Sequence, residues 1–332
     1  MKIFYLRQKS IFVCIMCIFI CISAVNASEQ ITQTFSIQPG WNAIFVNLSP
    51  SMPEPDNLFT STPVKQVLTY YPLLSSVDFI QSPDEIEWNA PGWNRWVPQD
   101  QKESMFNTLH AISQNQAYLI FSEQAFTLSI SGTPGVNHYQ WIPDSYNLTG
   151  FYVNPDTPPT FAQYFEGSTA HTNTTIFTLE GSKWKQVEPS IANIEYGKAY
   201  WVFCNGGSTY GGPLEIQTSG VDDKLIFRVG SSELSINLTN HSPGPLSVNL
   251  QKIDSTTEGE LVPLSIITYS SKMEKEYISL TSYDQEIEPD ESLTIRMAVQ
   301  QKMITNDVSC LIKVTDSLGN LVYIPVNAEK VD

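Results

Sequence analysis

The chain has 332 residues, of which 42% are hydrophobic and 11% aromatic, and its 34 acidic residues outnumber 18 basic ones to give a formal net charge of −16. This excess of acids argues against binding to nucleic acids or to anionic lipid surfaces, because both require Lys and Arg to replace counterions. A chain of this length is long for one hydrophobic core, so two or three domains are expected.

The first 27 residues have the three parts of a cleavable secretory signal. Lys2, Arg7 and Lys9 form a basic start, residues 11–22 are an unbroken apolar run, and Ala27 ends a cleavage site of small residues. At about 1.5 Å per residue the run spans roughly 18 Å, which is less than the ~30 Å core of a bilayer. We therefore expect cleavage near Ala27, no membrane span in the mature chain, and a location outside the cell, at its surface or in the periplasm.

Cleavage would change both the charge and the cysteine content. The mature chain keeps 15 basic and 34 acidic residues, a net charge of −19, and of the five cysteines it keeps Cys204 and Cys310. A disulfide between these two is allowed in an oxidising compartment, and two buried free thiols are the alternative. In either case hydrophobic cores, and not a disulfide framework, must stabilise the fold.

Comparison of the chain with itself indicates an internal repeat, with one unit at residues 28–134 and a second at residues 135–220. In each unit an aromatic residue followed by Asn begins an apolar strand, prolines follow, and an Ala-Tyr strand comes later. The first unit has an extra stretch at 73–92 and the second a Gly-rich insertion at 205–212. The matched positions are Trp41 with Tyr146, Asn42 with Asn147, Trp96 with Trp184, Tyr118 with Tyr200, and residues 126–130 with 214–218.

These motifs resemble a known family. The Gly-Trp-Asn strand start at Trp41, the tryptophan in the middle of each unit and the Ala-Tyr strands are similar to tandem "GWN" repeats of secreted and surface proteins of environmental bacteria, over residues 33–220. The resemblance implies a location and an architecture, and no activity. The residues themselves favour core positions, because Trp and Tyr in short strands bury a large area; a ligand groove is the alternative.

Residues 221–332 are predicted to form a separate antiparallel β-sandwich of about seven short strands. The segment resembles the immunoglobulin-like or fibronectin-like domains of bacterial surface proteins, although it lacks the Cys…Trp…Cys core of antibody domains. The predicted fold class is therefore all-β, with two related small β domains in tandem and a C-terminal sandwich. Residues 161–165 and 102–112 are the best helical candidates, and we expect both to be loop turns. The predicted sandwich strands include 225–229, 234–238, 246–250, 278–280, 293–297, 310–314 and 321–326.

The sequence shows no catalytic motif. None of the four histidines, His110, His138, His171 and His241, lies in a His-Glu-x-x-His zinc motif. The chain has no Cys-x-x-Cys pair in its mature part and no Gly-x-Ser-x-Gly elbow. The sequence therefore favours a protein that is not an enzyme.

The most unusual local composition lies at residues 84–96, where Asp84 and Glu87 stand beside Trp88 and Trp93. Acids that bind hydroxyl groups and indole faces that stack on sugar rings would suit a carbohydrate site. Paired carboxylates can also hydrolyse glycosides. The alternative is that Trp93 belongs to the repeat core and that the acids lie on a solvated loop.

Three functions follow from these patterns. The favoured one is a secreted or cell-surface, non-enzymatic β-module protein that acts in binding, adhesion or envelope assembly, with glycans or other envelope components as partners. The second is a carbohydrate-binding or carbohydrate-active protein with its site near residues 84–96. The third is a surface-layer or filament subunit in which open sandwich edges join copies of the chain. No cofactor is predicted. Calcium is considered at residues 84–96, at Asp222 and Asp223, or at Asp316, without EF-hand spacing to support it.

Overall fold

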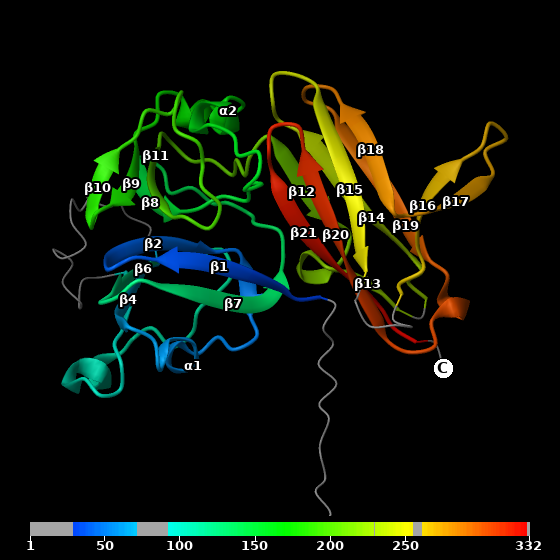
Figure 1. Cartoon of the computed structure of the whole chain (residues 1–332). Helices are drawn as coiled ribbons and strands as arrows, with labels where there is room; N and C mark the ends of the chain where they lie inside the picture. The colour runs from blue at the N-terminus through cyan, green and yellow to red at the C-terminus, as the bar shows by residue number, and fades with distance from the viewer. Residues whose placement is uncertain (1–28, 72–91, 229, 255–260, 331–332) are drawn as a thin grey trace, which may run out of the picture.

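A computed structural model describes residues 29–71, 92–228, 230–254 and 261–330. The predicted signal peptide, residues 1–27, lies outside these ranges. The described part is all-β, which confirms the predicted fold class: its strands form five sheets, and its α-helices are the single turns α1 (Pro55–Phe59) and α2 (Phe161–Phe165). Figure 1 shows two groups of sheets, with strands β1 to β11 on one side and β12 to β21 on the other.

The N-terminal group begins with a three-stranded sheet packed on a four-stranded sheet. The first has the order β1 (Ile31–Ile37), β7 (Phe126–Pro134) and β3 (Leu48–Pro50). The second has the order β2 (Gly40–Val46), β6 (Gln116–Ser122), β4 (Val64–Tyr70) and β5 (Trp93–Trp96). Because strand side chains alternate between faces, every second residue enters a core between the sheets. This core includes Phe35, Ile37, Val46, Val67, Trp96, Tyr118, Ile120, Leu128 and Ile130.

A second four-stranded sheet has the order β8 (Ser145–Thr149), β11 (Tyr200–Cys204), β9 (Ile176–Glu180) and β10 (Lys183–Gln186). The strand order is the same as in the first four-stranded sheet: β8, β11, β9 and β10 correspond to β2, β6, β4 and β5. The aromatic–Asn pairs also share a register, since Trp41 pairs with Phe121 and Tyr146 with Phe203. Four of the matched strands of each unit therefore occupy equivalent places in the two sheets. The predicted match of residues 126–130 with 214–218 was wrong, because β7 pairs with β1 and β3 whereas β12 (Leu214–Thr218) pairs with β14 (Glu233–Asn240).

The structure corrects a second sequence match. In the first sheet Tyr70 of β4 pairs with Trp93, and in the second the equivalent Leu179 pairs with Trp184. Trp184 is therefore equivalent to Trp93, and the predicted match of Trp184 with Trp96 was wrong by three residues. The first unit has extra residues before β5, so counting residues along the chain does not show which tryptophan of the first unit corresponds to Trp184.

The two four-stranded sheets also share a core, which lies between them. At one point their backbones meet, where the Ala199 N–H donates to the Ala43 carbonyl (3.1 Å) and the Phe45 N–H to the Gly197 carbonyl (2.8 Å). The small side chains at 43 and 199 permit this approach. Three tryptophans lie close together, with Trp201 6.4 Å from Trp93 and 6.2 Å from Trp184 between ring centres. The core comprises Trp41, Ala43, Phe45, Leu68, Tyr70, Trp93, Ala117, Leu119, Tyr152, Leu179, Trp184, Ala199 and Trp201.

The helix α2 covers the other face of the second sheet. Its Thr160 side chain accepts the Gln163 N–H (3.2 Å) and the Gln163 side chain accepts the Thr160 N–H (2.9 Å), which satisfies two donors of this single turn. Residues 161–165 are therefore helical, where a loop turn was expected, and residues 102–106 form a 3-10 turn. The core under α2 includes Trp141, Phe151, Phe161, Tyr164, Phe165, Ile176, Tyr200 and Val202.

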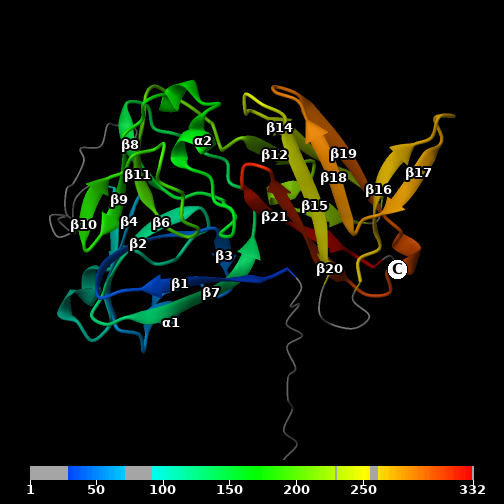
Figure 2. The same cartoon turned by 45° about the horizontal axis from the view of Figure 1, so that its top comes forward.

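The C-terminal group is a sandwich of two five-stranded sheets, visible from a second angle in Figure 2. One has the order β12 (Leu214–Thr218), β14 (Glu233–Asn240), β19 (Ser292–Val299), β16 (Leu264–Tyr269) and β17 (Lys275–Ser279). The other has the order β13 (Leu225–Phe227), β21 (Leu321–Ala328), β20 (Val308–Asp316), β15 (Leu246–Asp254) and β18 (Ser282–Ile287). All strand pairs are antiparallel except β13 with β21. The core includes Phe227, Ile236, Leu238, Val248, Leu250, Ile295, Met297, Ile312 and Ile324.

The two groups are joined by more than the connecting chain. Strand β12, which the sequence places in the second repeat unit, pairs with β14 and so forms an edge of the sandwich. The β20–β21 turn contacts the second unit, where the Asn154 N–H donates to the Gly319 carbonyl (2.8 Å). Gly319 has φ +83°, and a side chain there would meet the Thr157 carbonyl oxygen at 2.0 Å. Glycine is required at this contact for both reasons.

Candidate functional site

The strand β17 is the most exposed element of the sandwich. All five of its residues are exposed, and both Tyr277 and Ile278 are 52% exposed. Because adjacent strand residues point to opposite faces, these two side chains leave neither face of β17 covered. Met273, in the turn before β17, is 81% exposed. Figure 1 shows the β16–β17 hairpin extending away from the rest of the sandwich.

Strand β17 lies at the end of its sheet, so one side of its backbone is open. The other sandwich edges in the described residues are protected in ways typical of soluble proteins. Strand β13 has three residues, and β18 exposes the acids Asp284 and Glu286. Strand β12 lies beside residues 136–140, which border a pocket along its edge. Among these four described sandwich edges, β17 alone combines a full-length open edge with large exposed apolar side chains.

Polar contacts hold the hairpin in place without covering this edge. The Lys275 ammonium donates to both carboxylate oxygens of Glu233 on β14, at 2.7 and 2.9 Å. The Arg296 guanidinium of β19 donates to the hydroxyl of Tyr269 at 3.1 Å. The edge is therefore presented on a tethered hairpin and not on a loose loop.

Only part of this edge could be predicted from the sequence. The sequence predicted a strand at 278–280, whereas β17 spans Lys275–Ser279. The charged residues Lys275 and Glu276 hide the strand, because they break the apolar alternation that marks a half-buried strand. An edge strand with both faces exposed would show this composition, in which an aromatic and an aliphatic residue, Tyr277 and Ile278, follow charged residues.

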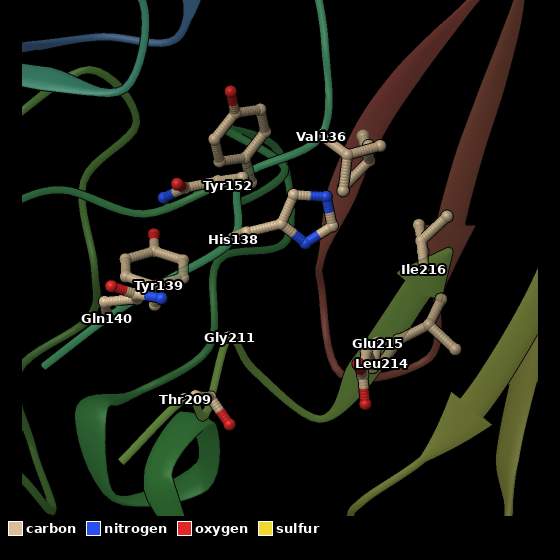
Figure 3. A pocket seen from close by; sticks show the side chains of 12 residues that line it. Val136, His138, Tyr139, Gln140, Tyr152, Thr209, Gly211, Leu214, Glu215 and Ile216 are labelled. Carbon is tan, nitrogen blue, oxygen red and sulfur yellow. The ribbon is translucent and has the colours of Figure 1, made fainter. Parts of the chain in front are cut away.

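A pocket of about 210 Å³ lies where residues 136–140 pass the edge of β12 (Figure 3). His138 projects from this segment toward β12 in Figure 3. Its Nε2 is 2.8 Å from the carboxylate of Asp223, and Glu215 on β12 forms a second pair with His241 at 2.7 Å. Burial alone would raise the pKa of Glu215, but its hydrogen bonds with His241 and Gln217 outweigh burial and lower it. Each imidazole is thus paired with a carboxylate, and neither contacts a nucleophile.

A Ser–His pair occurs elsewhere, between Ser168 Oγ and His171 Nδ1 at 2.6 Å. Both side chains are buried, and the imidazole packs against the rings of Trp141 and Phe165 at 4.4 and 4.3 Å. Nucleophilic catalysis requires that a substrate reach the hydroxyl. Because aromatic rings cover this pair, its arrangement is that of a core contact.

The structure describes one of the four predicted carbohydrate-site residues, Trp93. Trp93 is 7% exposed and packs against Tyr70 and Trp201 in the core between the two four-stranded sheets. Asp84, Glu87 and Trp88 lie outside the described residues, so a carbohydrate or calcium site there stays a prediction. In the described part of the chain Trp93 is a core residue.

Cys204 and Cys310 are both free and buried, and they lie in different cores. The disulfide left open by the sequence is therefore not formed, and the alternative of two buried thiols is correct. Among the described residues no three His, Cys, Asp or Glu side chains are grouped to hold a metal ion. The carboxylate of Asp316, one of the considered calcium ligands, accepts the backbone N–H groups of Leu318 and Asn320.

No helix in the described ranges is long and apolar enough to cross a membrane. No protein-family model matches the chain, and no curated protein does. Solved structures with some similarity include the YadV chaperone, at 12% identity over 36% of this chain and 53% of the chaperone with a TM-score of 0.25. The CupB2 chaperone of Pseudomonas aeruginosa is 13% identical over 34% of this chain and 55% of that chain, with a TM-score of 0.23.

A PapD-like domain of human CEP192 is 12% identical over 36% of this chain and 86% of that domain, with a TM-score of 0.24. The aligned parts span about half the length of the two chaperones. Scores this low carry no argument about function, so the function must be argued from the chain itself.

Proposed function

We propose that the protein is an exported, non-enzymatic β-module protein that acts in assembly, and that it associates with a second copy of itself through β17. One observation carries this proposal: β17 is an open sheet edge whose five residues are all exposed and include Tyr277 and Ile278. Soluble proteins avoid such edges, because they pair readily with other strands. Pairing would satisfy the open backbone groups and cover both apolar side chains.

The sequence of β17 suits antiparallel pairing with its own copy. With Tyr277 on the two-fold axis, Tyr277 faces Tyr277 of the second copy, Glu276 faces Ile278, and Lys275 faces Ser279. No like charges stand opposite each other in this register, and aromatic cross-strand pairs are favourable. An isologous interface of this kind closes as a dimer. The signal peptide predicted at residues 1–27 supports action outside the cytoplasm.

The test is the oligomeric state of the mature chain, residues 28–332, measured by sedimentation velocity from 1 to about 100 µM. We expect a monomer–dimer equilibrium, and we expect Tyr277→Lys and Ile278→Lys to make the chain monomeric. Thr294→Lys is the matched control, because Thr294 is an exposed residue of the central strand β19 in the same sheet. A wild-type chain that stays monomeric at 100 µM, or dimers that survive both β17 substitutions, would refute the proposal.

A further inference from the structure

A second feature lies far along the chain from β17, at the junction of the two repeat units. A cleft of about 510 Å³ separates β1 and the turn before β2 from the β9–β10 turn and the loop before β11. Its volume lies within the range of small-ligand sites. The cleft lies where the two units join, since Ala43, Ile44, Gly197 and Lys198 line it and the backbone hydrogen bonds between the sheets are made at residues 43–45 and 197–199.

The lining mixes strong acceptors with donors. Glu180 and Glu195 supply carboxylates, Lys198 an ammonium, and Thr34 and Ser36 exposed hydroxyls. Both carboxylate side chains are more than half exposed, at 53% and 67%, so they keep free acceptor positions for a ligand. Trp41 contributes an apolar part of the floor.

Each carboxylate of this cleft is paired with a lysine. Lys198 is 2.7 Å from Glu195, and Lys185 is 3.0 Å from Glu180. The hydrogen bond and charge of Lys185, helped by the charge of Lys198, lower the pKa of Glu180, so its carboxylate is ionised at neutral pH. The lining holds these two carboxylates and the Lys198 ammonium, and Lys185 lies beside it. With Lys185 included the four charges cancel, on a chain whose total is −16. An ionic ligand would therefore find no net attraction there.

We infer that the cleft between the repeat units binds an uncharged, polyhydroxylated ligand, that is, a neutral carbohydrate. Sugar hydroxyls donate to carboxylates and accept from ammonium and hydroxyl groups, so one ring can use both kinds of lining group. An apolar ligand would leave these groups unpaired, which is costly. None of the described lining residues belongs to residues 84–96, and the site does not depend on association through β17.

The experiment is calorimetric titration of the mature chain with neutral hexasaccharides of glucose (β-1,4 and β-1,3), xylose, mannose and N-acetylglucosamine, and with hexagalacturonate as a charged probe. We expect saturable binding of at least one neutral sugar, little change in its affinity between 50 and 500 mM NaCl, and no binding of hexagalacturonate. Salt has little effect on a neutral ligand because there is no ligand charge to screen.

Two variants locate the site. Ser36→Phe fills the cleft from an exposed position on β1, and Glu180→Gln removes a charged acceptor; each should weaken binding about tenfold or more. Ser131→Phe is the control, because Ser131 is exposed on the neighbouring strand β7 and does not line the cleft. Unchanged melting temperatures check the fold of each variant. Failure of every neutral sugar to bind, preference for hexagalacturonate, or binding that both cleft variants retain would overturn the inference.

Discussion

Asn42 and Asn147 make the same hydrogen bonds at equivalent positions of the two four-stranded sheets. The Oδ1 of Asn42 accepts the Gln38 N–H (2.9 Å) and its Nδ2 donates to the Gln38 carbonyl (2.8 Å). Asn147 does the same with Ile142, at 2.9 and 3.3 Å. Each side-chain amide therefore bonds the backbone N–H and carbonyl of a residue just before the strand, as a neighbouring strand would. This contact gives the asparagine of each aromatic–Asn pair a structural role.

Replacing either asparagine should destabilise the fold. Asn42→Ala or Asn147→Ala leaves one backbone N–H and one carbonyl without their partner, so we expect a loss of about 1–3 kcal/mol in the free energy of unfolding. Urea denaturation of the mature chain measures it. Asn306→Ala is the control, because Asn306 is exposed in a bend of the sandwich, and it should cost under about 0.5 kcal/mol. Equal stabilities for all three variants would contradict this role.

The paired tyrosines of the repeat should behave in parallel. The hydroxyl of Tyr118 accepts the Ser113 N–H (2.7 Å), and that of Tyr200 accepts the Glu195 N–H (2.9 Å), in each case five residues upstream. Phenylalanine at either position keeps the ring and removes this acceptor, so we expect a loss of about 1–2 kcal/mol. Thermal unfolding compares these variants with Tyr277→Phe, whose hydroxyl is on an exposed side chain. If Tyr118→Phe and Tyr200→Phe have the same melting temperature as Tyr277→Phe, these hydrogen bonds do not stabilise the fold.

The equivalent positions of Asn42 and Asn147, and of Tyr118 and Tyr200, could be predicted from the sequence. Strand positions and the core roles of Trp41, Tyr118 and Tyr200 follow from local pattern, because alternation and aromatic spacing are local properties. The partner of a strand is not local: β12 has the pattern of a repeat-closing strand, yet it pairs with β14 of the sandwich. The edge at β17 and the cleft between the units depend on which surfaces stay uncovered after packing. That information exists only in the tertiary arrangement.

The buried imidazole of His171 should make stability depend on pH. Burial lowers its pKa to about 4, against about 6.5 in an unfolded chain. The unfolded state therefore binds the proton first, so stability is complete above pH 6.5 and is lost as the pH falls toward 4. The loss from this residue should reach at most about 3 kcal/mol.

The variant His171→Phe isolates this effect. It keeps an aromatic ring among Trp141, Phe165 and Tyr210 and removes the titrating group. The difference in unfolding free energy between wild type and variant should therefore shift in the variant's favour as the pH drops from 6.5 to 4. His110→Gln, at an exposed position, should keep the wild-type slope. Parallel pH profiles for wild type and His171→Phe would refute the assignment.

Association through β17 should strengthen with salt. Each mature copy carries a net charge of −19, so two copies repel at long range, while the pairing across Tyr277 buries apolar and backbone groups. Raising NaCl from 10 mM to 500 mM shortens the Debye length from about 30 Å to below 10 Å and screens that repulsion. The dimer dissociation constant from sedimentation velocity should therefore fall. Weaker association at high salt would instead point to ion pairs and contradict an apolar strand interface.

The two mature cysteines should be unreactive until the protein unfolds. Burial, helped by Asp144, raises the pKa of Cys204 to about 11, and burial raises that of Cys310 to about 12. Because the thiolate is the reactive form, both should resist a thiol reagent such as DTNB at pH 8 in the folded chain. Both should react in 6 M guanidinium, and dithiothreitol should leave the melting temperature unchanged, since the folded chain contains no disulfide between them. Rapid modification of the native chain, or a melting temperature lowered by dithiothreitol, would show that the cores around these residues are not closed as the structure describes.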